Sequence, residues 1–284
     1  MDTKLTTTNH ATDVVGLTYV YPVISRRLGG LSVGINLNIN NACNWRCIYC
    51  QVPDLKLGAA PKLDAKLLES ELRFFLNEVL KGDFYERFNV DQDKRVIKDI
   101  AIAGNGEPTS LKEFADAIDL IGRVATEMRV FPESQFVLIT NGSLIHQTKV
   151  QDGLKVLNSY GGEVWFKFDS ATTKGRVLIN NTTQSCKTSL ENLILSSQLC
   201  KTKIQTCLVD YNQQGLSIDE REAYLDLMRQ VKTECPDLSQ VMLYTLARPS
   251  LQPEAEFIEP MSLAVLNLFA EDIRKLGFSV SVNK

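Results

Sequence analysis

The sequence predicts an α/β fold in which parallel strands alternate with helices that pack against the sheet. Six short segments rich in branched and aromatic residues recur along the chain, and in the stretches between them apolar residues repeat at intervals of three and four. Alternating strands and helices form parallel sheets with crossover connections. Such sheets close into a full or partial barrel or lie open as a doubly wound sheet, and the pattern alone leaves both arrangements open.

The predicted strands are four to eight residues long, and each has an apolar centre. They are Leu31 to Asn38, Ile97 to Ala103, Phe136 to Thr140, Val164 to Asp169, Ile204 to Val209 and Val241 to Leu246.

Three helices are predicted from apolar stripes that would face the sheet. The stripes are Leu68, Leu72, Phe75 and Val79, then Phe114, Ile118, Ile121 and Ala125, and finally Leu266, Phe269, Ile273 and Leu276. The longest polar stretch, Gly82 to Lys94, joins the first helix to the second strand. We expect a solvated loop there, or else a lid or partner loop.

The size of the chain predicts one catalytic domain over residues 1–284. With 284 residues, of which 44% are hydrophobic, it can build one large core but is short for two domains. We expect an N-terminal extension over 1–20 that is disordered or closes a barrel edge, a core over about 31–250, and a C-terminal helix and strand over 251–284.

Charge and hydropathy narrow the classes of function. The net charge of -3 gives no global attraction to nucleic acid. No apolar run approaches the roughly 20 residues of a membrane-spanning helix, and the polar start lacks the apolar centre of a secretion signal. We therefore expect a cytoplasmic protein without a membrane partner.

Three of the seven cysteines lie close together. The segment NNACNWRCIYCQVP follows the first predicted strand and places Cys43, Cys47 and Cys50 in a Cys-x3-Cys-x2-Cys spacing. Three thiolates without a nearby fourth ligand would leave an open position on a soft metal centre, where a substrate binds directly. The alternatives are a zinc site that borrows a distant cysteine, or three unrelated buried cysteines.

The triplet, with Tyr49 directly before Cys50, resembles the signature of the radical S-adenosylmethionine superfamily. The resemblance runs from about Tyr21 to Leu266 and is strongest to the branch that contains the tricyclic-wyosine synthases of transfer RNA and uncharacterised bacterial relatives. It is carried by PVISRRLGGLSVGIN (22–36), GNGEPT (104–109), TNG (140–142), KFD (167–169) and ARP (247–249). It implies a partial (β/α)6 TIM-like barrel of parallel strands with outer helices.

The resemblance also implies a chemistry. A 4Fe–4S cluster on the three cysteines would cleave S-adenosylmethionine to a 5′-deoxyadenosyl radical, which abstracts hydrogen from an unidentified substrate, either an RNA nucleoside or a small metabolite. RNA rests on branch analogy alone. A flavodoxin- or ferredoxin-type protein would donate the electron. The alternative is a non-catalytic iron–sulfur protein for electron transfer or redox sensing.

One departure concerns a second cluster. The wyosine synthases carry it on cysteines upstream of the triplet, whereas this chain has no cysteine before Cys43, so their specific reaction is not carried over. The other cysteines are widely spaced, with Cys200 in a helical pattern and Cys207 in a strand. Such cysteines are usually small core residues, although a second cluster on Cys186, Cys200 and Cys207 is the alternative.

The glycine-rich segment follows the second predicted strand. By resemblance, Gly104, Asn105, Gly106 and Glu107 lie where the superfamily contacts the methionine amino group. Small residues let a backbone approach closely, and Glu107 can accept a hydrogen bond from an ammonium. The alternative is a plain strand-ending turn.

The fourth predicted strand alternates in WFKFDS, so Trp165, Lys167 and Asp169 share one face. The bulky Phe166 and Phe168 suit the interface between barrel and helices, which turns the other face inward. A solvated outward face is the alternative.

Four polar residues receive roles by resemblance. We expect Lys167 to bind the methionine carboxylate or a substrate anion and to take part in catalysis. We expect Asp169 to bind ribose or substrate hydroxyls. Asn141 would lie near the ribose, although an Asn-Gly pair is also a good turn. Arg248 could hold an anion bidentately or be an exposed loop residue.

The candidate segments all follow predicted strands. The carboxyl ends of barrel strands are where catalytic sites of such folds lie, so we expect the segments to converge on one rim. Arg26 and Arg27, upstream of the first strand, would line the mouth or cap the base.

Overall fold

In the computed structural model, which describes residues 5, 15–25 and 28–283, the chain forms one curved central sheet. Its strand order is β1-β2-β5-β6-β7-β8-β10-β12. The bounds are β1 (Val20–Ser25), β2 (Gly30–Ile35), β5 (Ile97–Ile102), β6 (Gln135–Thr140), β7 (Glu163–Lys167), β8 (Lys201–Cys207), β10 (Gln240–Tyr244) and β12 (Ser279–Asn283). Every neighbouring pair is parallel except β1 with β2.

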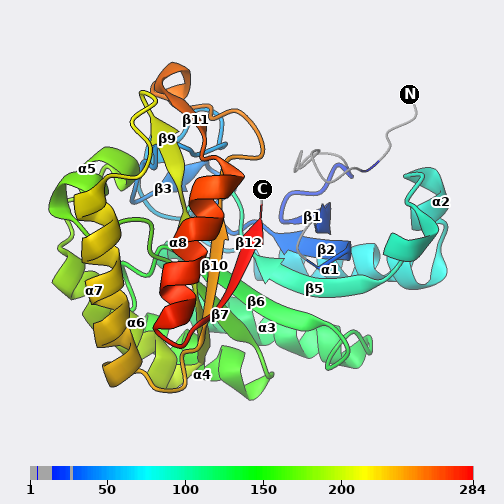
Figure 1. Cartoon of the computed structure of the whole chain (residues 1–284). Coiled ribbons are helices and arrows are strands. Elements are labelled where there is room, and N and C mark those ends of the chain that lie inside the picture. Colours follow the sequence, from blue (N-terminus) through cyan, green and yellow to red (C-terminus); the bar gives the residue numbers. More distant parts are fainter. Residues whose placement is uncertain (1–4, 6–14, 26–27, 284) are drawn as a thin grey trace.

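The predicted fold class is confirmed. The six predicted strands correspond to β2, β5, β6, β7, β8 and β10, which lie side by side in chain order. No pairing joins β1 to β12 among the described residues, so the sheet curves as a partial barrel (Figure 1). Parallel neighbours joined by crossover helices explain this order.

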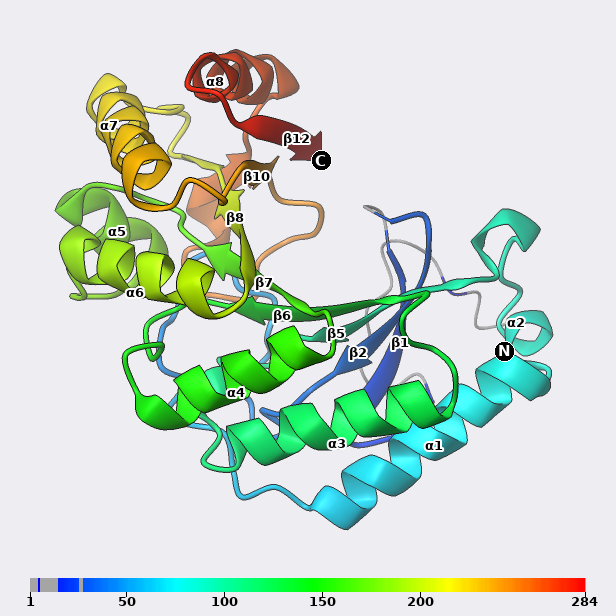
Figure 2. The same cartoon turned by 90° about the horizontal axis from the view of Figure 1, so that it is seen from below.

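Helices cover the outer face of the sheet in an arc (Figure 2). They are α1 (Ala65–Lys81), α3 (Phe114–Glu127), α4 (Thr148–Ser159), α5 (Thr173–Asn180), α6 (Cys186–Leu199), α7 (Ile218–Glu234) and α8 (Leu263–Lys275). The three predicted apolar stripes lie in α1, α3 and α8, and nearly all their residues are buried. Cys200 lies one residue beyond α6, so its predicted helical position is wrong.

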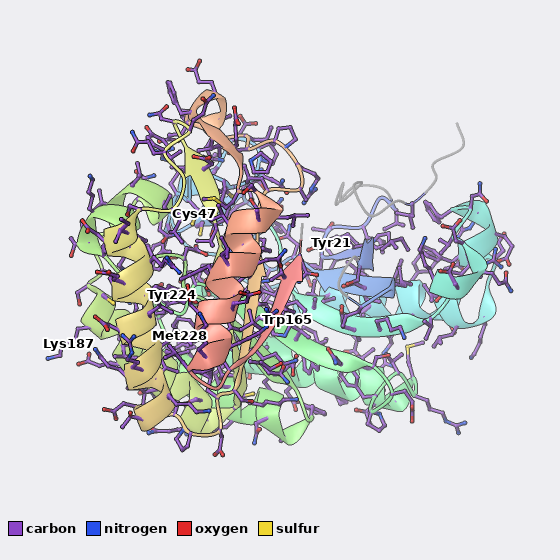
Figure 3. All side chains as sticks on the ribbon, in the orientation of Figure 1. Tyr21, Cys47, Trp165, Lys187, Tyr224 and Met228 are labelled. Atoms are coloured by element: carbon purple, nitrogen blue, oxygen red, sulfur yellow. The ribbon has the colours of Figure 1, made fainter. Side chains whose placement is uncertain are left out.

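Contacts between neighbouring helices hold this arc together. Tyr224 and Met228 point from α7 toward α8, whereas Lys187 points into solvent (Figure 3). The Tyr224 ring packs edge-on against Phe269 of α8, with centroids 5.2 Å apart. These buried side chains explain why α7 stays on the sheet although its exposed face is highly charged.

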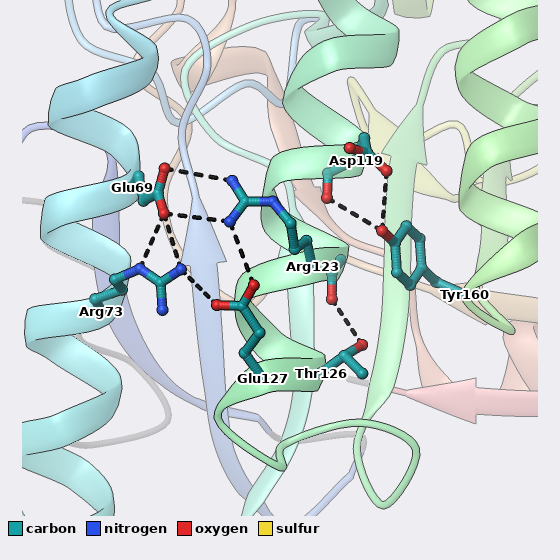
Figure 4. A network of polar contacts seen from close by, with 8 residues as sticks. Glu69, Arg73, Asp119, Arg123, Thr126, Glu127 and Tyr160 are labelled. Atoms are coloured by element: carbon teal, nitrogen blue, oxygen red, sulfur yellow. Dashed lines mark hydrogen bonds and ion pairs between the residues drawn. The ribbon is translucent and has the colours of Figure 1, made fainter.

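An ion-pair network joins α1 to α3 (Figure 4). Arg73 contacts Glu69 at 2.8 Å and Glu127 at 2.6 Å, and Arg123 contacts Glu69 at 3.3 Å. These groups are largely exposed, and exposed pairs contribute little individually. The apolar stripes, rather than this network, therefore hold the helices on the sheet.

The stretch from Gly82 to Lys94 is not the solvated loop that its polarity suggested. It contains α2 (Phe84–Arg87) and η1 (Gln92–Lys94). Phe84 is 1% exposed, and its ring packs 5.2 Å from Phe75 and 4.8 Å from Phe88. One buried aromatic residue therefore anchors the stretch to α1.

The two faces of β7 separate as the alternation predicts. Phe166 and Phe168 belong to the large core between sheet and helices, whereas Trp165 belongs to a small cluster inside the barrel with Ala101 and Val137. Lys167 and Asp169 follow Trp165 on the inner face. The carboxyl end of β7 therefore presents both groups to the barrel interior.

None of the described helices is long and apolar enough to cross a membrane.

Candidate active site

The three cysteines lie on one loop after β2. This loop begins with the short strand β3 (Ala42–Cys43), which pairs in parallel with β4 (Lys56–Leu57). The Gly58 amide donates to the Cys43 carbonyl at 2.9 Å, and the Cys50 amide donates to the Cys47 carbonyl at 2.9 Å. All three thiols are partly buried. Backbone pairing therefore fixes the loop at both ends of the triplet.

The donor set of this loop fits an iron–sulfur cluster. Burial raises the pKa of Cys43 to about 12 and that of Cys47 to about 11, with Lys167 opposing the shift at Cys47. A ligand must be a thiolate, so a cationic centre has to displace these protons. Within the described residues, no three Cys, His, Asp or Glu side chains surround one point as they would a single ion. Three thiolates on a four-iron cluster would leave one iron open.

Two buried asparagines brace the loop from β2. Asn38 Nδ2 donates to the Ala42 carbonyl at 2.9 Å and to the Glu107 carbonyl at 3.2 Å. Asn36 Oδ1 accepts from the amide of Asn105 at 3.0 Å. Sequence reasoning missed both residues, although the alternation in INLNIN places them on one face of the strand end.

The glycines of GNGEPT let two loops approach each other. A Cβ on Gly106 would lie 2.0 Å from the Ala42 carbonyl oxygen, and one on Gly104 would lie 2.5 Å from Asn36 Oδ1. From the sequence we expected these glycines to let the backbone approach a ligand. In the structure, part of this close approach is between two loops of the chain itself. Gly104 also lines a cavity at the carboxyl ends of the strands, whereas Gly106 does not.

Glu107 is buried behind the site at 2% exposure. Its carboxylate accepts from Thr109 Oγ1 at 2.5 Å, from Thr140 Oγ1 at 2.6 Å and from the Asn141 amide at 2.7 Å. Burial raises the pKa of Glu107, and these hydrogen bonds oppose the shift. The carboxylate therefore ties the end of β5 to the end of β6, and its predicted contact with an ammonium stays a prediction.

Asn141 connects β6 to the cysteine loop. Its Nδ2 donates to Asn44 Oδ1 at 2.9 Å, and Asn44 lies between Cys43 and Cys47. Gly142 follows with φ +71°, and a Cβ there would lie 2.1 Å from the Phe166 ring, so only glycine fits. The TNG segment positions the loop from its side, and its contact with a ribose stays a prediction.

Asp169 lies at the centre of a buried network. It accepts a short hydrogen bond from Tyr49 Oη, and bonds from Asn180 Nδ2 at 2.8 Å and the Cys207 amide at 2.9 Å. Burial, followed by the charge of Asp169, raises the pKa of Tyr49 well above its ordinary value, so the phenol donates. Both carboxylate oxygens are thus engaged within the protein, and the assignment of Asp169 to ligand hydroxyls stays a prediction.

Lys167 stands beside Tyr49, with Nζ 4.6 Å from the ring centroid. Burial lowers the pKa of Lys167, but Tyr244, Asp169 and the nearby thiols raise it by more than burial lowers it. The pKa therefore lies well above its ordinary value. The side chain is therefore an ammonium. An ammonium suits a ligand carboxylate, whereas a Schiff base would require the free amine.

A cavity of about 390 Å³ opens at the carboxyl ends of the strands. Several predicted residues line it, namely Tyr49, Cys50, Gly104, Asn105, Lys167 and Arg248. Others lie outside its lining, namely Cys43, Cys47, Gly106, Glu107, Asn141 and Asp169. Some of the predicted residues therefore form the cavity wall, and the others lie behind it.

Sequence reasoning missed part of the cavity wall. Tyr21, Asp99, Cys207 and Tyr244 line it, and Tyr21 Oη donates to the Ala103 carbonyl at 3.0 Å. Tyr21 lies on β1, which the sequence analysis did not identify as a strand. Arg26 and Arg27 lie outside the described residues.

The loop that carries Arg248 docks on the cysteine loop. Gln51 Nε2 donates to the Arg248 carbonyl at 3.0 Å, and Ser250 Oγ donates to the Ile48 carbonyl at 2.7 Å. Strand ends that are distant in sequence therefore meet around the triplet, as the predicted convergence on one rim requires.

A second cavity of about 660 Å³ lies on the other side of the cysteine loop. Asn44 and three lysines, Lys62, Lys112 and Lys149, are among its lining residues. It shares no lining residue with the first cavity and none of the cysteines borders it. We therefore treat the smaller cavity, which Cys50 and Lys167 border, as the candidate active site.

Comparison with known proteins gives distant relatives. No protein-family model matches the sequence. The chain is 28% identical to the GTPase Obg of Brachyspira hyodysenteriae over 48% of its own length and 17% of that protein. It is 25% identical to a UPF0026 protein of Helicobacter pylori over 81% of its own length and 66% of that protein. The chain spans less than two thirds of these relatives.

Solved structures share its fold. A radical SAM methyltransferase from Sphaerobacter thermophilus matches 95% of this chain and 70% of its own, with 14% identity and a TM-score of 0.60. A structure of TYW1 with a lysine-pyruvate adduct bound matches 86% and 73%, with 15% identity and a TM-score of 0.58. A spore photoproduct lyase matches 85% and 73%, with 10% identity and a TM-score of 0.54. The chain therefore has the fold of the radical S-adenosylmethionine enzymes, as its motifs predicted.

Proposed function

We propose that the chain is a radical S-adenosylmethionine enzyme. Cys43, Cys47 and Cys50 hold a 4Fe–4S cluster, and S-adenosylmethionine binds its open iron from the central cavity. The observation that carries this proposal is that Cys50 and the Lys167 ammonium border one cavity at the carboxyl ends of the strands. When bound, the cluster supplies the electron that splits S-adenosylmethionine into methionine and the 5′-deoxyadenosyl radical.

The chain's own groups would orient the cosubstrate. Lys167 offers a buried ammonium to the methionine carboxylate, and a charge-assisted bond in such a site is stronger than a neutral one. Gly104 and Asn105 bring backbone groups to the same cavity for the methionine amino group. Asp169, which lies behind the cavity wall, would fix the loop through its hydrogen bond with Tyr49, which lines the cavity.

The remaining wall is left for the substrate. Tyr21, Asp99, Trp165 and Arg248 offer aromatic faces and charges of both signs. The substrate, from which the radical abstracts hydrogen, is an RNA nucleoside or a small metabolite. The likeness to TYW1 supports RNA by fold alone.

An external protein would supply the electron that reduces the cluster. We assign this role to a flavodoxin- or ferredoxin-type donor in the cytoplasm. A reducing compartment also keeps the three thiols available for iron.

The test is the anaerobic formation of 5′-deoxyadenosine. The native protein is reconstituted with iron and sulfide, then given dithionite and S-adenosylmethionine, beside a triple alanine variant of the three cysteines. Cys200→Ala is the matched control, since this thiol is buried away from the cavity. We expect product from the native chain and the control only.

One result would overturn the enzymatic proposal. If the native protein holds four irons but forms no 5′-deoxyadenosine, even when a cell extract supplies substrates, the electron-transfer or redox-sensing alternative replaces it. A native protein that retains no iron would overturn both.

A further inference from the structure

Three consecutive residues at the end of α5, Ile179, Asn180 and Asn181, hydrogen-bond to the cysteine loop. The Ile48 amide donates to the Ile179 carbonyl at 2.9 Å, and Asn181 Nδ2 donates to the Arg46 carbonyl at 2.8 Å. Between them, Asn180 Nδ2 donates to the Cys47 sulfur at 3.3 Å. Two of these contacts therefore engage backbone groups of the loop, the Ile48 amide and the Arg46 carbonyl, whereas the one from Asn180 reaches the sulfur of a proposed cluster ligand.

The orientation of the Asn180 amide follows from its neighbours. Nδ2 also donates to Asp169 Oδ2 at 2.8 Å, so it faces two acceptors, a thiol sulfur and a carboxylate. Asp169 is itself held by Tyr49 and by the Cys207 amide. A buried carboxylate that is fixed on two sides thus holds the donor against the sulfur.

The other end of this amide has no compensating contact. Asn180 is 1% exposed, and its Oδ1 has no hydrogen-bond partner among the described residues. Leaving a buried acceptor unsatisfied costs stability, which an apolar side chain of the same size would avoid. Packing alone therefore does not explain an amide at this position, whereas the two hydrogen bonds from its nitrogen, to Asp169 and to the Cys47 sulfur, do.

A hydrogen bond to a ligand sulfur changes the redox chemistry of a cluster. Reduction adds negative charge, which spreads onto the thiolates, so a donor stabilises the reduced state more than the oxidised state. The effect is strong where burial keeps water from competing. An N–H donor at Cys47 therefore raises the reduction potential.

We propose that Asn180 is a positioning residue that raises the reduction potential of the cluster through its hydrogen bond to Cys47. The inference rests on the proposed function, because it requires a cluster on the three cysteines. Its consequence is that reduction by an external donor becomes easier, at the expense of reducing strength toward S-adenosylmethionine.

The experiment is a redox titration of the reconstituted protein, followed by electron paramagnetic resonance of the reduced cluster. Asn180→Leu keeps the size of the side chain and removes the donor. Asn181→Gly is the matched control: it removes a bond to the same loop, and glycine tolerates the backbone φ of 48°. We expect a lower potential for Asn180→Leu and an unchanged potential for Asn181→Gly, with equal iron content.

An Asn180→Leu variant that holds four irons at the native potential would overturn the inference, as would an equal shift in Asn181→Gly. If Asn180→Leu loses the cluster, the native protein with ¹⁵N-labelled asparagine amides decides. Pulsed resonance that detects a side-chain amide nitrogen coupled to the cluster supports the bond, and the absence of coupling overturns it. Failure of the proposed function is distinct, because the native protein would then hold no cluster or release no 5′-deoxyadenosine.

Discussion

Replacing Gly106 with alanine should disable the site from behind the cavity. The new Cβ would lie 2.0 Å from the Ala42 carbonyl oxygen, whereas ordinary contact begins at 3.4 Å, so the two loops must separate by about 1.4 Å. Ala42 directly precedes Cys43, and Asn38 Nδ2 bridges the two loops there. Overpacking of this kind costs about 1–3 kcal/mol of unfolding free energy. A displacement near 1 Å in a site costs roughly 100-fold in rate.

The assay compares Gly106→Ala with Gly58→Ala, whose added Cβ would lie 3.5 Å from the same Ala42 in ordinary contact. Urea unfolding gives the stability difference, and iron content with 5′-deoxyadenosine formation reports on the site. We expect Gly58→Ala to behave as the native chain and Gly106→Ala to lose iron or about 100-fold in rate. If Gly106→Ala matches Gly58→Ala in both respects, then the close approach of the two loops does not hold the cysteines, and our account of the glycine is wrong.

Two further predictions concern charge. Lys167→Met should weaken S-adenosylmethionine binding about 10-fold to 100-fold with iron content unchanged, because a hydrogen bond to a charged group contributes about 1.5–3 kcal/mol; equilibrium dialysis measures it, and unaltered binding would contradict the assignment. Glu254→Gln removes the partner of Arg46, which binds it through contacts of 2.7 Å, and should cost about 0.5–1 kcal/mol at neutral pH. Since Arg46 lowers the pKa of Glu254, this difference is full above 4.5 and is lost as the pH falls through the lowered folded value. Urea unfolding of the apoprotein over pH tests this, and a difference that persists at low pH would refute it.

The fold was largely predictable because its central strands are buried on both faces. Strands such as Gln135–Thr140 carry an apolar run that is visible without tertiary information. The edge strand Val20–Ser25 was missed because it contains Pro22, which is typical of edges and turns. The helix Thr173–Asn180 has a weak apolar stripe, and its buried Arg176 hydrogen-bonds to Ser170, Gln184 and Ser189, contacts that no apolar pattern indicates.

The candidate site also has a part that the sequence predicts and a part that depends on tertiary contacts. The spacing of the cysteines is local, so the sequence alone was enough to select them as candidate ligands. The role of Glu107 depends on Thr140 and Asn141 of another strand, and no local pattern indicates that these groups will engage its carboxylate. The contact between Asn180 and Cys47 joins residues 133 positions apart, and Asn-Asn near a helix end otherwise indicates only a cap.

The contacts around the cysteine loop bear on how an open iron can be maintained. The loop is held by Asn38 after β2, by Asn141 after β6, by Asn180 at the end of α5 and by Ser250 after β10. Only the contact from Asn180 reaches a sulfur atom. The other three contacts reach backbone carbonyls or the Asn44 side chain, so they hold the loop without engaging the cysteine sulfurs. A loop whose shape is set by the protein does not need a fourth ligand to keep its geometry. The position that a fourth cysteine would occupy in a structural cluster can therefore face the cavity that Lys167 borders.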